Sequence, residues 1–319
     1  MATGLQKAGA RILAVYDDNP NRAASLARFY PGARVAASFD GILEDGEIEL
    51  VVTAAIPARR ADLMVAAVKR GKHVLCTKPL CTDLIHLGRI EEAVRQYHGR
   101  IFVFYAESLL FPAMTRALEL VGKGAIGEVR LLQGSSPHKL RRTDRPPWFF
   151  DPRLSGGILC DIGSHQADQF LRFTRARDVR VVHARSGGPG KSECEGWENW
   201  GAMTLEADNG AVGHFRVDWL YPEHGEMWGD PRVSVVGTQG TIEVRNLFSR
   251  HGKPGGNTLV VLSEQGICQE ECEPGCVQFF EQVVADLAAG TESAITFEHV
   301  IRTSRISLEA QEIAKRRRA

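Results

Sequence analysis

The sequence lacks an excess of charge of either sign, and it lacks long apolar runs. Lysine plus arginine and aspartate plus glutamate both number 39 in 319 residues, so the chain has no net field to attract nucleic acid or an anionic membrane. No run approaches the roughly 18 apolar residues of a membrane span. Residues 1–6 do not show the basic and then apolar pattern of a secretory signal. We therefore expect no nucleic-acid or membrane partner and a cytoplasmic location.

Cysteine is sparse and odd in number. Seven cysteines in a chain of this length favour free thiols in a reducing compartment over a disulfide framework. Cys268, Cys272 and Cys276 recur every four residues, but zinc sites use paired C-x-x-C spacing, and no histidine stands near these cysteines. We expect no metal there.

The glycine-rich turn G-x-G-x-x-G, which holds the pyrophosphate in dinucleotide-binding folds, is also absent. Only ten residues precede Arg11, where the first predicted strand begins, whereas a βαβ unit needs about 30 residues. Residues 4–10 resemble the end of a crossover helix. Two explanations stay open. We favour a strand, turn and half-helix upstream of this start; the alternative is a chain that truly lacks them.

The length and the 44% hydrophobic content predict two domains, at 1–106 and 107–319. The first domain alternates β-branched runs with helical stretches, which is typical of a Rossmann-like, doubly wound parallel sheet in an α/β fold. Asn19 and Thr82 are the predicted N-caps of two of its helices. The predicted strands are 11–16, 50–54, 73–76 and 101–105, and the predicted helices are 19–30, 58–69 and 82–97.

In the second domain strands follow one another directly, which predicts an α+β unit with a large, mainly antiparallel sheet. These strands are 128–135, 179–185, 200–207, 211–219, 232–236, 240–244 and 258–262. Helices are expected at 275–289 and 296–316, and we expect the last helix to pack back on the first domain. The basic residues 315–318 suit the negative end of that helix's dipole; a targeting or nucleic-acid role for them is the alternative.

Asp17 follows the first predicted strand, where a dinucleotide-binding fold uses a carboxylate to bind the adenosine ribose. Its charge would repel a 2'-phosphate, so we expect NAD as the cofactor in preference to NADP. The alternative is that Asp17 and Asp18 only form a turn before Asn19.

Two further segments carry residues suited to moving a proton and a hydride. Lys78 and Pro79 follow strand 73–76, and the carboxyl ends of parallel strands are where such sheets bind ligands, although a lone lysine there is usually only solvated. Asp161 and His165 are four residues apart and share one face of a predicted helix. His165 suits a general base. A structural Asp–His hydrogen bond, or a divalent-metal site with His183, is the alternative.

Together these motifs resemble the active site of the Gfo/Idh/MocA oxidoreductases, a family named for glucose-fructose oxidoreductase, inositol dehydrogenase and MocA. The resemblance rests on Thr77-Lys78-Pro79, on residues 148–152 (Trp-Phe-Phe-Asp-Pro), on Gly156-Gly157, and on Asp161 through His165. It extends from Arg11 to the last helix. Thr77 stands where relatives have glutamate, and the loop Ala55, Ile56, Pro57 stands where they often have Thr-Pro-Asn.

The resemblance implies an NAD-dependent oxidoreductase that removes hydride from a secondary hydroxyl of a sugar, cyclitol or sugar derivative. His165 would take the hydroxyl proton while Lys78 steadies the oxygen. Asp161 would orient His165, contact a substrate hydroxyl, or both. Backbone groups of Ala55, Ile56 and Pro57 would contact the cofactor beside Lys78 and Pro79. The implied assembly is a homodimer or homotetramer.

Weaker candidates for substrate contact are Glu107, His138 and Trp148, and Trp148 could equally be a core residue. Arg141, Arg142 and Arg145 could bind an acidic sugar, although a solvated loop is the favoured interpretation. Two other functions stay open: a lyase or glycosidase that recycles its NAD, and a non-catalytic binding or oligomerisation protein.

Overall fold

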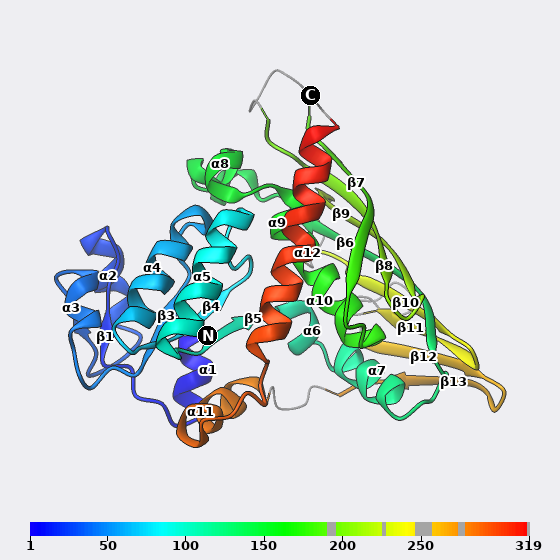
Figure 1. Cartoon of the computed structure of the whole chain (residues 1–319), viewed down its shortest axis with the longest axis horizontal. Helices are drawn as coiled ribbons and strands as arrows, with labels where there is room; N and C mark the ends of the chain where they lie inside the picture. Colours follow the sequence, from blue (N-terminus) through cyan, green and yellow to red (C-terminus); the bar gives the residue numbers. More distant parts are fainter. Residues whose placement is uncertain (190–195, 225–227, 246–256, 274–277, 318–319) are drawn as a thin grey trace.

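Two hydrophobic cores organise the chain, one under a parallel sheet and one under a large mixed sheet. The structure is a computed structural model that describes residues 1–189, 196–224, 228–245, 257–273 and 278–317. Figure 1 shows the first unit and the large sheet on opposite sides of the long helix α12 (Phe297–Arg316). Among the described residues, no helix combines the length and apolar character needed to cross a membrane.

The first unit has the expected parallel strands, but they form two separate sheets. β3, β4 and β5 pair in parallel, and β1 pairs in parallel with β2. Among the described residues no strand joins β1 to β3. The elements are α1 (Ala2–Lys7), β1 (Ala14–Val15), α2 (Pro20–Ala27), β2 (Arg34–Val35), α3 (Phe39–Leu43), β3 (Leu50–Thr53), α4 (Pro57–Lys69), β4 (His73–Thr77), α5 (Leu84–Tyr97) and β5 (Ile101–Phe104).

The second unit is an eight-stranded sheet in the order β13-β12-β11-β10-β6-β9-β8-β7. Its neighbours are antiparallel except for β6 and β9, which pair in parallel. Together the two units confirm the predicted fold class. The strands are β6 (Val129–Lys139), β7 (Val179–Gly187), β8 (Trp200–Ala207), β9 (Val212–Tyr221), β10 (Arg232–Gly237), β11 (Gly240–Arg245), β12 (Thr258–Ser263) and β13 (Gly266–Glu271).

Helices lie on the side of the sheet that faces the first unit (Figure 1). These are α6 (Ala106–Leu109), α7 (Pro112–Gly122), α8 (Pro152–Ser155), α9 (Ile158–Asp161) and α10 (Gly163–Thr174), with 3-10 turns η1 (Arg142–Asp144) and η2 (Pro147–Phe150). The long helix α12 contacts β7, α9 and α10 of this unit and also α5 and β5 of the first. It therefore ties the two cores together, while α11 (Phe279–Ala289) packs its phenylalanines into the first core.

Several predicted boundaries were wrong. The strand predicted at 11–16 is reduced to Ala14–Val15, and α2 ends at Ala27 instead of near residue 30. Thr82 does not cap α5; Asp83 does, because its Oδ1 accepts a hydrogen bond from the backbone N of His86 at 2.7 Å. The predicted start of the helix at 275 and the last residue of the basic tail, 318, lie outside the described residues.

Candidate active site

The loop after β4 and the helix pair α9–α10 meet at one ion pair. Lys78 Nζ lies 2.6 Å from Asp161 Oδ1, and both side chains are about four-fifths buried (20% and 22% exposed). The two residues are 83 positions apart in the chain. The structure thus brings together the two motifs that the sequence singled out, and Asp161 directs its carboxylate at the lysine ammonium.

Two glycines and two side-chain caps fix the position of Asp161. Gly156 and Gly157 both have positive φ, 91° and 99°, a conformation that favours glycine, and a Cβ on Gly157 would lie 2.5 Å from the Gln311 side chain. Gln311 Oε1 accepts a hydrogen bond from the backbone N of Leu159 at 2.9 Å. Glu198 Oε2 accepts from the N of Ile158 at 2.8 Å. The first turn of α9 is therefore capped by two side chains, Glu198 just before β8 and Gln311 of α12.

His165 lies in the first turn of α10 and is 3% exposed. Burial, followed by the charge of Lys78 and the neighbouring His138, holds the pKa of His165 well below its usual value, so the ring is neutral near pH 7 and able to accept a proton. Its Nδ1 has no hydrogen-bond partner among the described residues. The Asp161 carboxylate accepts its hydrogen bond from Lys78 and not from His165 among the described contacts. Its predicted role in orienting His165 therefore stays a prediction.

Glu107 and His138 extend this polar group toward β6. Glu107 is 1% exposed and accepts a hydrogen bond from Ser136 Oγ at 2.5 Å; His138 Nε2 lies 3.5 Å from Glu107 Oε1. Burial raises the pKa of Glu107 to about 7, against the opposing effects of Ser136 and Lys78. Burial and then Lys78 lower the pKa of His138 to about 3. At neutral pH the site therefore combines a neutral histidine with a carboxyl group close to its midpoint.

The unusual pKa of Glu107 predicts a pH-dependent stability. Folding raises the pKa of this acid above the ordinary 4.5. Its contribution is therefore fully present below that value and is lost as the pH rises through about 7. Replacing Glu107 with glutamine should remove this dependence. The free energy of unfolding that is lost between pH 5 and pH 8 should then be about 2 kcal/mol smaller than in the unaltered protein. Urea unfolding at both pH values measures the difference.

The exposed Glu264 provides the control, since Glu264→Gln should leave the stability difference between the two pH values as it is in the unaltered protein. Equal effects of Glu107→Gln at pH 5 and pH 8 would show that the buried carboxyl group does not titrate as described.

The buried Arg60 holds the two loops predicted to contact the cofactor, and sequence reasoning missed it. Its guanidinium donates to the backbone oxygens of Ala55 at 2.7 Å, Thr77 at 2.8 Å and Pro79 at 2.5 Å, and the residue is 5% exposed. It thereby joins the loop after β3 to both sides of Lys78, whose peptide bond to Pro79 is cis. An arginine on a predicted helix gave no signal for this role, because its acceptors are backbone groups.

Removing this clamp should loosen both loops. Arg60→Met would leave three carbonyl oxygens without their donor, and each unsatisfied buried group costs roughly 1–3 kcal/mol. We expect a loss of stability of about 3 kcal/mol and a tenfold or larger increase in the Kd for NAD, with partial recovery in Arg60→Lys. Calorimetric titration measures the Kd, and Arg70→Met on the exposed end of α4 is the matched control. An unchanged Kd in folded Arg60→Met would rule out this positioning role.

Asp17 follows β1 and forms the turn that the alternative interpretation predicted. Its Oδ1 accepts a hydrogen bond from the backbone N of Asn19 at 2.8 Å, so it does form the turn before α2. Asp18 pairs with Arg59 at 3.2 Å, which places the loop after β1 next to the first turn of α4. Binding of a ribose by Asp17 stays a prediction.

Aromatic residues other than Trp148 border the Asp161 carboxylate. Trp148 is half-buried and packs edge-on against Phe149, and no hydrogen bond joins it to Lys78 or Asp161 in the described part of the chain. A narrow cavity of about 10 Å³ beside Asp161 is instead lined by Phe149, Trp197 and Trp219. Nothing in the sequence distinguished these tryptophans from core residues.

The three arginines of the predicted basic loop, residues 141–145, do not all point to solvent. Arg141 pairs with Asp144 at 2.8 Å on the surface, and Arg142 lies over the Phe150 ring at 5.2 Å. Arg145 turns inward, where burial lowers its pKa and the charge of Asp161 opposes that shift. The favoured interpretation as a solvated loop therefore does not hold for Arg145.

The cysteines and histidines show no metal centre in the described segments, where no group of three or more potential ligands is found. Cys268 is exposed on β13, Cys272 is half-buried, and Cys276 lies outside the described residues. His183 lies in β7, opposite Thr204 of β8.

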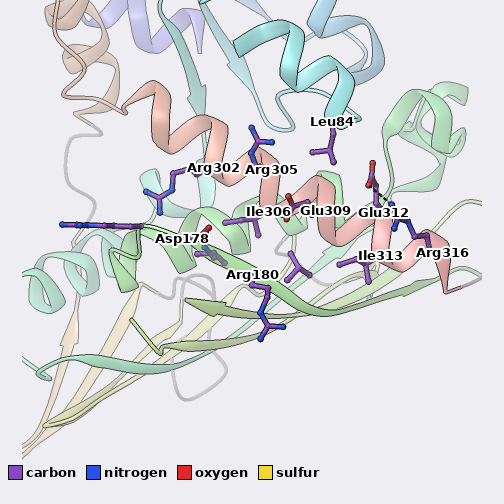
Figure 2. A pocket seen from close by; sticks show the side chains of 13 residues that line it. Leu84, Asp178, Arg180, Arg302, Arg305, Ile306, Glu309, Glu312, Ile313 and Arg316 are labelled. Carbon is purple, nitrogen blue, oxygen red and sulfur yellow. Dashed lines mark hydrogen bonds and ion pairs between the residues drawn. The ribbon is translucent and has the colours of Figure 1, made fainter. Parts of the chain in front are cut away.

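A separate, wider cavity lies away from these groups. It has a volume of about 700 Å³ between α12 and β7, and Figure 2 shows Arg302, Arg305, Glu309 and Arg316 along its helical side. Its arginines are largely paired with acids, as in Arg305 with Glu91 at 2.8 Å and Arg316 with Glu312 at 3.6 Å. The candidate site residues do not line this cavity.

Comparisons with known proteins agree with this geometry. Residues 2–105 match a family model described as an oxidoreductase family with an NAD-binding Rossmann fold, and residues 114–243 match the GFO/IDH/MocA C-terminal domain. A presumed oxidoreductase from Erwinia carotovora atroseptica SCRI1043 shares 32% identity and superposes with a TM-score of 0.94, covering 98% of this chain and 94% of that one.

More distant similarities name substrates. Inositol 2-dehydrogenase 2 of Saccharopolyspora erythraea is 29% identical over 237 residues, 74% of this chain and 66% of that protein. The chain spans between about half and two thirds of the length of the first such relatives. A levoglucosan dehydrogenase in complex with NADH and levoglucosan shares the fold, with a TM-score of 0.82 at 19% identity, covering 96% of this chain and 88% of that one.

Proposed function

Because this chain belongs to the GFO/IDH/MocA family of oxidoreductases, we propose that it is an NAD-dependent dehydrogenase. Its substrate is a sugar, a cyclitol or a sugar derivative, oxidised at a secondary hydroxyl. The observation that carries the proposal is the Lys78–Asp161 ion pair beside the neutral, buried His165. The inositol and levoglucosan dehydrogenases among the similar proteins support the substrate class.

The residues present fit the two ends of a dinucleotide, while the sequence holds no G-x-G-x-x-G turn for its pyrophosphate. The loop after β1 is joined to the first turn of α4 by the Arg59–Asp18 pair, and the loops after β3 and β4 are joined by Arg60, so these segments lie along one rim. Asp17 on this rim would bind the adenosine ribose, and its charge favours NAD. Backbone groups of Ala55, Ile56 and Pro57, together with Lys78 and Pro79, would hold the nicotinamide end.

NAD held by these residues would supply the acceptor for the hydride of the substrate carbon. His165 takes the hydroxyl proton, for which its lowered pKa keeps the ring unprotonated at neutral pH. Lys78 donates a hydrogen bond to the reacting oxygen and stabilises its developing charge. Asp161 holds the ammonium in place and would accept a hydrogen bond from a second hydroxyl, while Glu107 and His138 are further candidates for substrate contact.

Formation of NADH with a panel of sugars and cyclitols tests the proposal, with Lys78→Ala and His165→Ala as inactive references. Unchanged turnover in both variants would overturn it. Product release without net NADH would instead indicate a lyase or glycosidase that recycles NAD, and failure to bind NAD in calorimetry would favour a non-catalytic protein.

The proposal includes a homodimer or homotetramer in the cytoplasm. Exposed apolar side chains on sheet strands support the assembly: Leu131, Val182, Leu220 and Leu262. The free thiols Cys76, Cys81 and Cys160 support a reducing compartment. Analytical ultracentrifugation gives the assembly size, and a monomer at micromolar concentration would refute this part.

A further inference from the structure

Arg145 is a partly buried cation at the edge of the candidate site. It lies between η1 and η2, and its guanidinium carbon is 4.4 Å from the centroid of the Phe149 ring and 4.8 Å from that of Trp219. Two aromatic faces therefore hold the guanidinium plane in place. Such stacking restricts the orientation of the side chain before any ligand arrives.

The guanidinium of Arg145 has no acidic partner within ion-pair distance in the described part of the chain. Its Nε donates to the backbone oxygen of Leu140 at 3.0 Å. The opposite edge of the guanidinium, formed by its two terminal nitrogens, stays available to a ligand. Arg141 and Arg153, on the same stretch of chain, each pair with an aspartate at 2.8 Å and 2.7 Å. Partly buried charges are usually paired, so Arg145 stands out as a cation prepared for an anion.

Trp219 connects Arg145 to the reacting groups. Its ring also packs against His138 at 5.4 Å between centroids, and with Phe149 it lines the narrow cavity beside Asp161. Asp161 would repel an anion, but its charge is balanced by Lys78 at 2.6 Å. An anionic group bound by Arg145 would thus lie near, but not on, the hydroxyl that Lys78 and His165 serve.

We infer that the substrate is an anionic sugar derivative whose charged group is bound by Arg145. The inference rests on the proposed function and names its substrate class. A guanidinium edge binds the two oxygens of a carboxylate in a planar, bidentate geometry, and it also recognises phosphate. Arg145 is therefore a specificity residue, and the chemistry at the secondary hydroxyl is unchanged.

The test compares D-glucose, D-glucuronate and D-glucose 6-phosphate as substrates with NAD, and measures their Kd by calorimetry in the presence of NADH. A hydrogen bond to a charged group contributes about 1.5–3 kcal/mol. Arg145→Gln should therefore lower kcat/KM and raise the Kd for the preferred anionic sugar by about 10- to 100-fold. Arg145→Lys should retain part of the binding, and Arg141→Gln, on the exposed part of the loop, should match the unaltered protein.

A preference for glucuronate or for glucose 6-phosphate that disappears in Arg145→Gln supports the inference, and the preferred compound identifies the anion as carboxylate or phosphate. Oxidation of glucose with rejection of both anions would overturn the inference and leave the dehydrogenase assignment standing. An equal loss for neutral and anionic sugars in Arg145→Gln and Arg145→Lys, with unchanged Tm, would also overturn it. If neither these compounds nor the panel of sugars and cyclitols named above is bound or oxidised, both the inference and the proposed function fail.

Discussion

Replacing Lys78 with methionine is expected to lower kcat/KM for any substrate of this protein by about 1000-fold or more. Methionine keeps the length and apolar stem of the side chain but removes the ammonium that would steady the reacting oxygen. Loss of one preorganised donor of this kind typically costs 10²–10³-fold in kcat. The change also leaves Asp161 without its partner at 2.6 Å, so the negative charge would no longer be balanced where the substrate oxygen gains charge.

The matched control is Lys69→Met, which removes an exposed lysine at the end of α4 and should leave kcat/KM within a factor of two. The Kd for NAD in Lys78→Met should change much less than kcat. Turnover within tenfold of the unaltered protein would contradict the assigned role of Lys78, provided that near-UV circular dichroism shows an intact fold.

Replacing His165 with asparagine is expected to lower kcat by about 10²–10⁴-fold, the usual contribution of a positioned general base. The pKa of His165 is held well below its ordinary value by burial and by Lys78. The unprotonated base is therefore present throughout the neutral range, and activity should fall only at acidic pH. In Lys78→Met, loss of the neighbouring cation should raise the pKa of His165, which NMR titration of the imidazole can follow directly.

His98→Asn is the control for this variant, because His98 is exposed and already occupies the left-handed region with φ 57°, where asparagine is well tolerated. Equal kcat in His165→Asn and the unaltered protein would contradict the general-base assignment. A decrease in kcat accompanied by an unchanged pH profile in the alkaline range is the expected pattern.

The sequence was sufficient to predict the helices and strands whose residues show a strong local pattern. The β-branched runs at 50–54, 73–76 and 101–105 became β3, β4 and β5, and Pro20 and Asn19 did start α2. By contrast, β13 has the sequence Gly-Ile-Cys-Gln-Glu-Glu and is almost entirely exposed. An edge strand of polar residues has no buried face, and only pairing with β12 makes it a strand.

The candidate site was predictable where the residue type and its position after a strand or glycine pair together indicate a chemical role. Lys78, Asp161 and His165 could be singled out as candidates because a lysine after a parallel strand and an Asp–His pair after two glycines form a recognisable motif, and the structure pairs Lys78 with Asp161. Arg60, Gln311 and Glu198 could not, since each binds backbone groups, which no residue type in the sequence marks. Arg145 was noticed as part of a basic loop, but only packing on Phe149 and Trp219 separates it from Arg141.

The cap that Gln311 places on α9 has a consequence for the order of events during protein synthesis. The backbone N–H of Leu159 leaves the ribosome 152 residues before the side chain that satisfies it. Until α12 is made and docked, the turn that positions Asp161 lacks one of its acceptors. The turn that carries Asp161 can therefore reach its fully capped form only after the C-terminal helix has been made and has packed over Gly157.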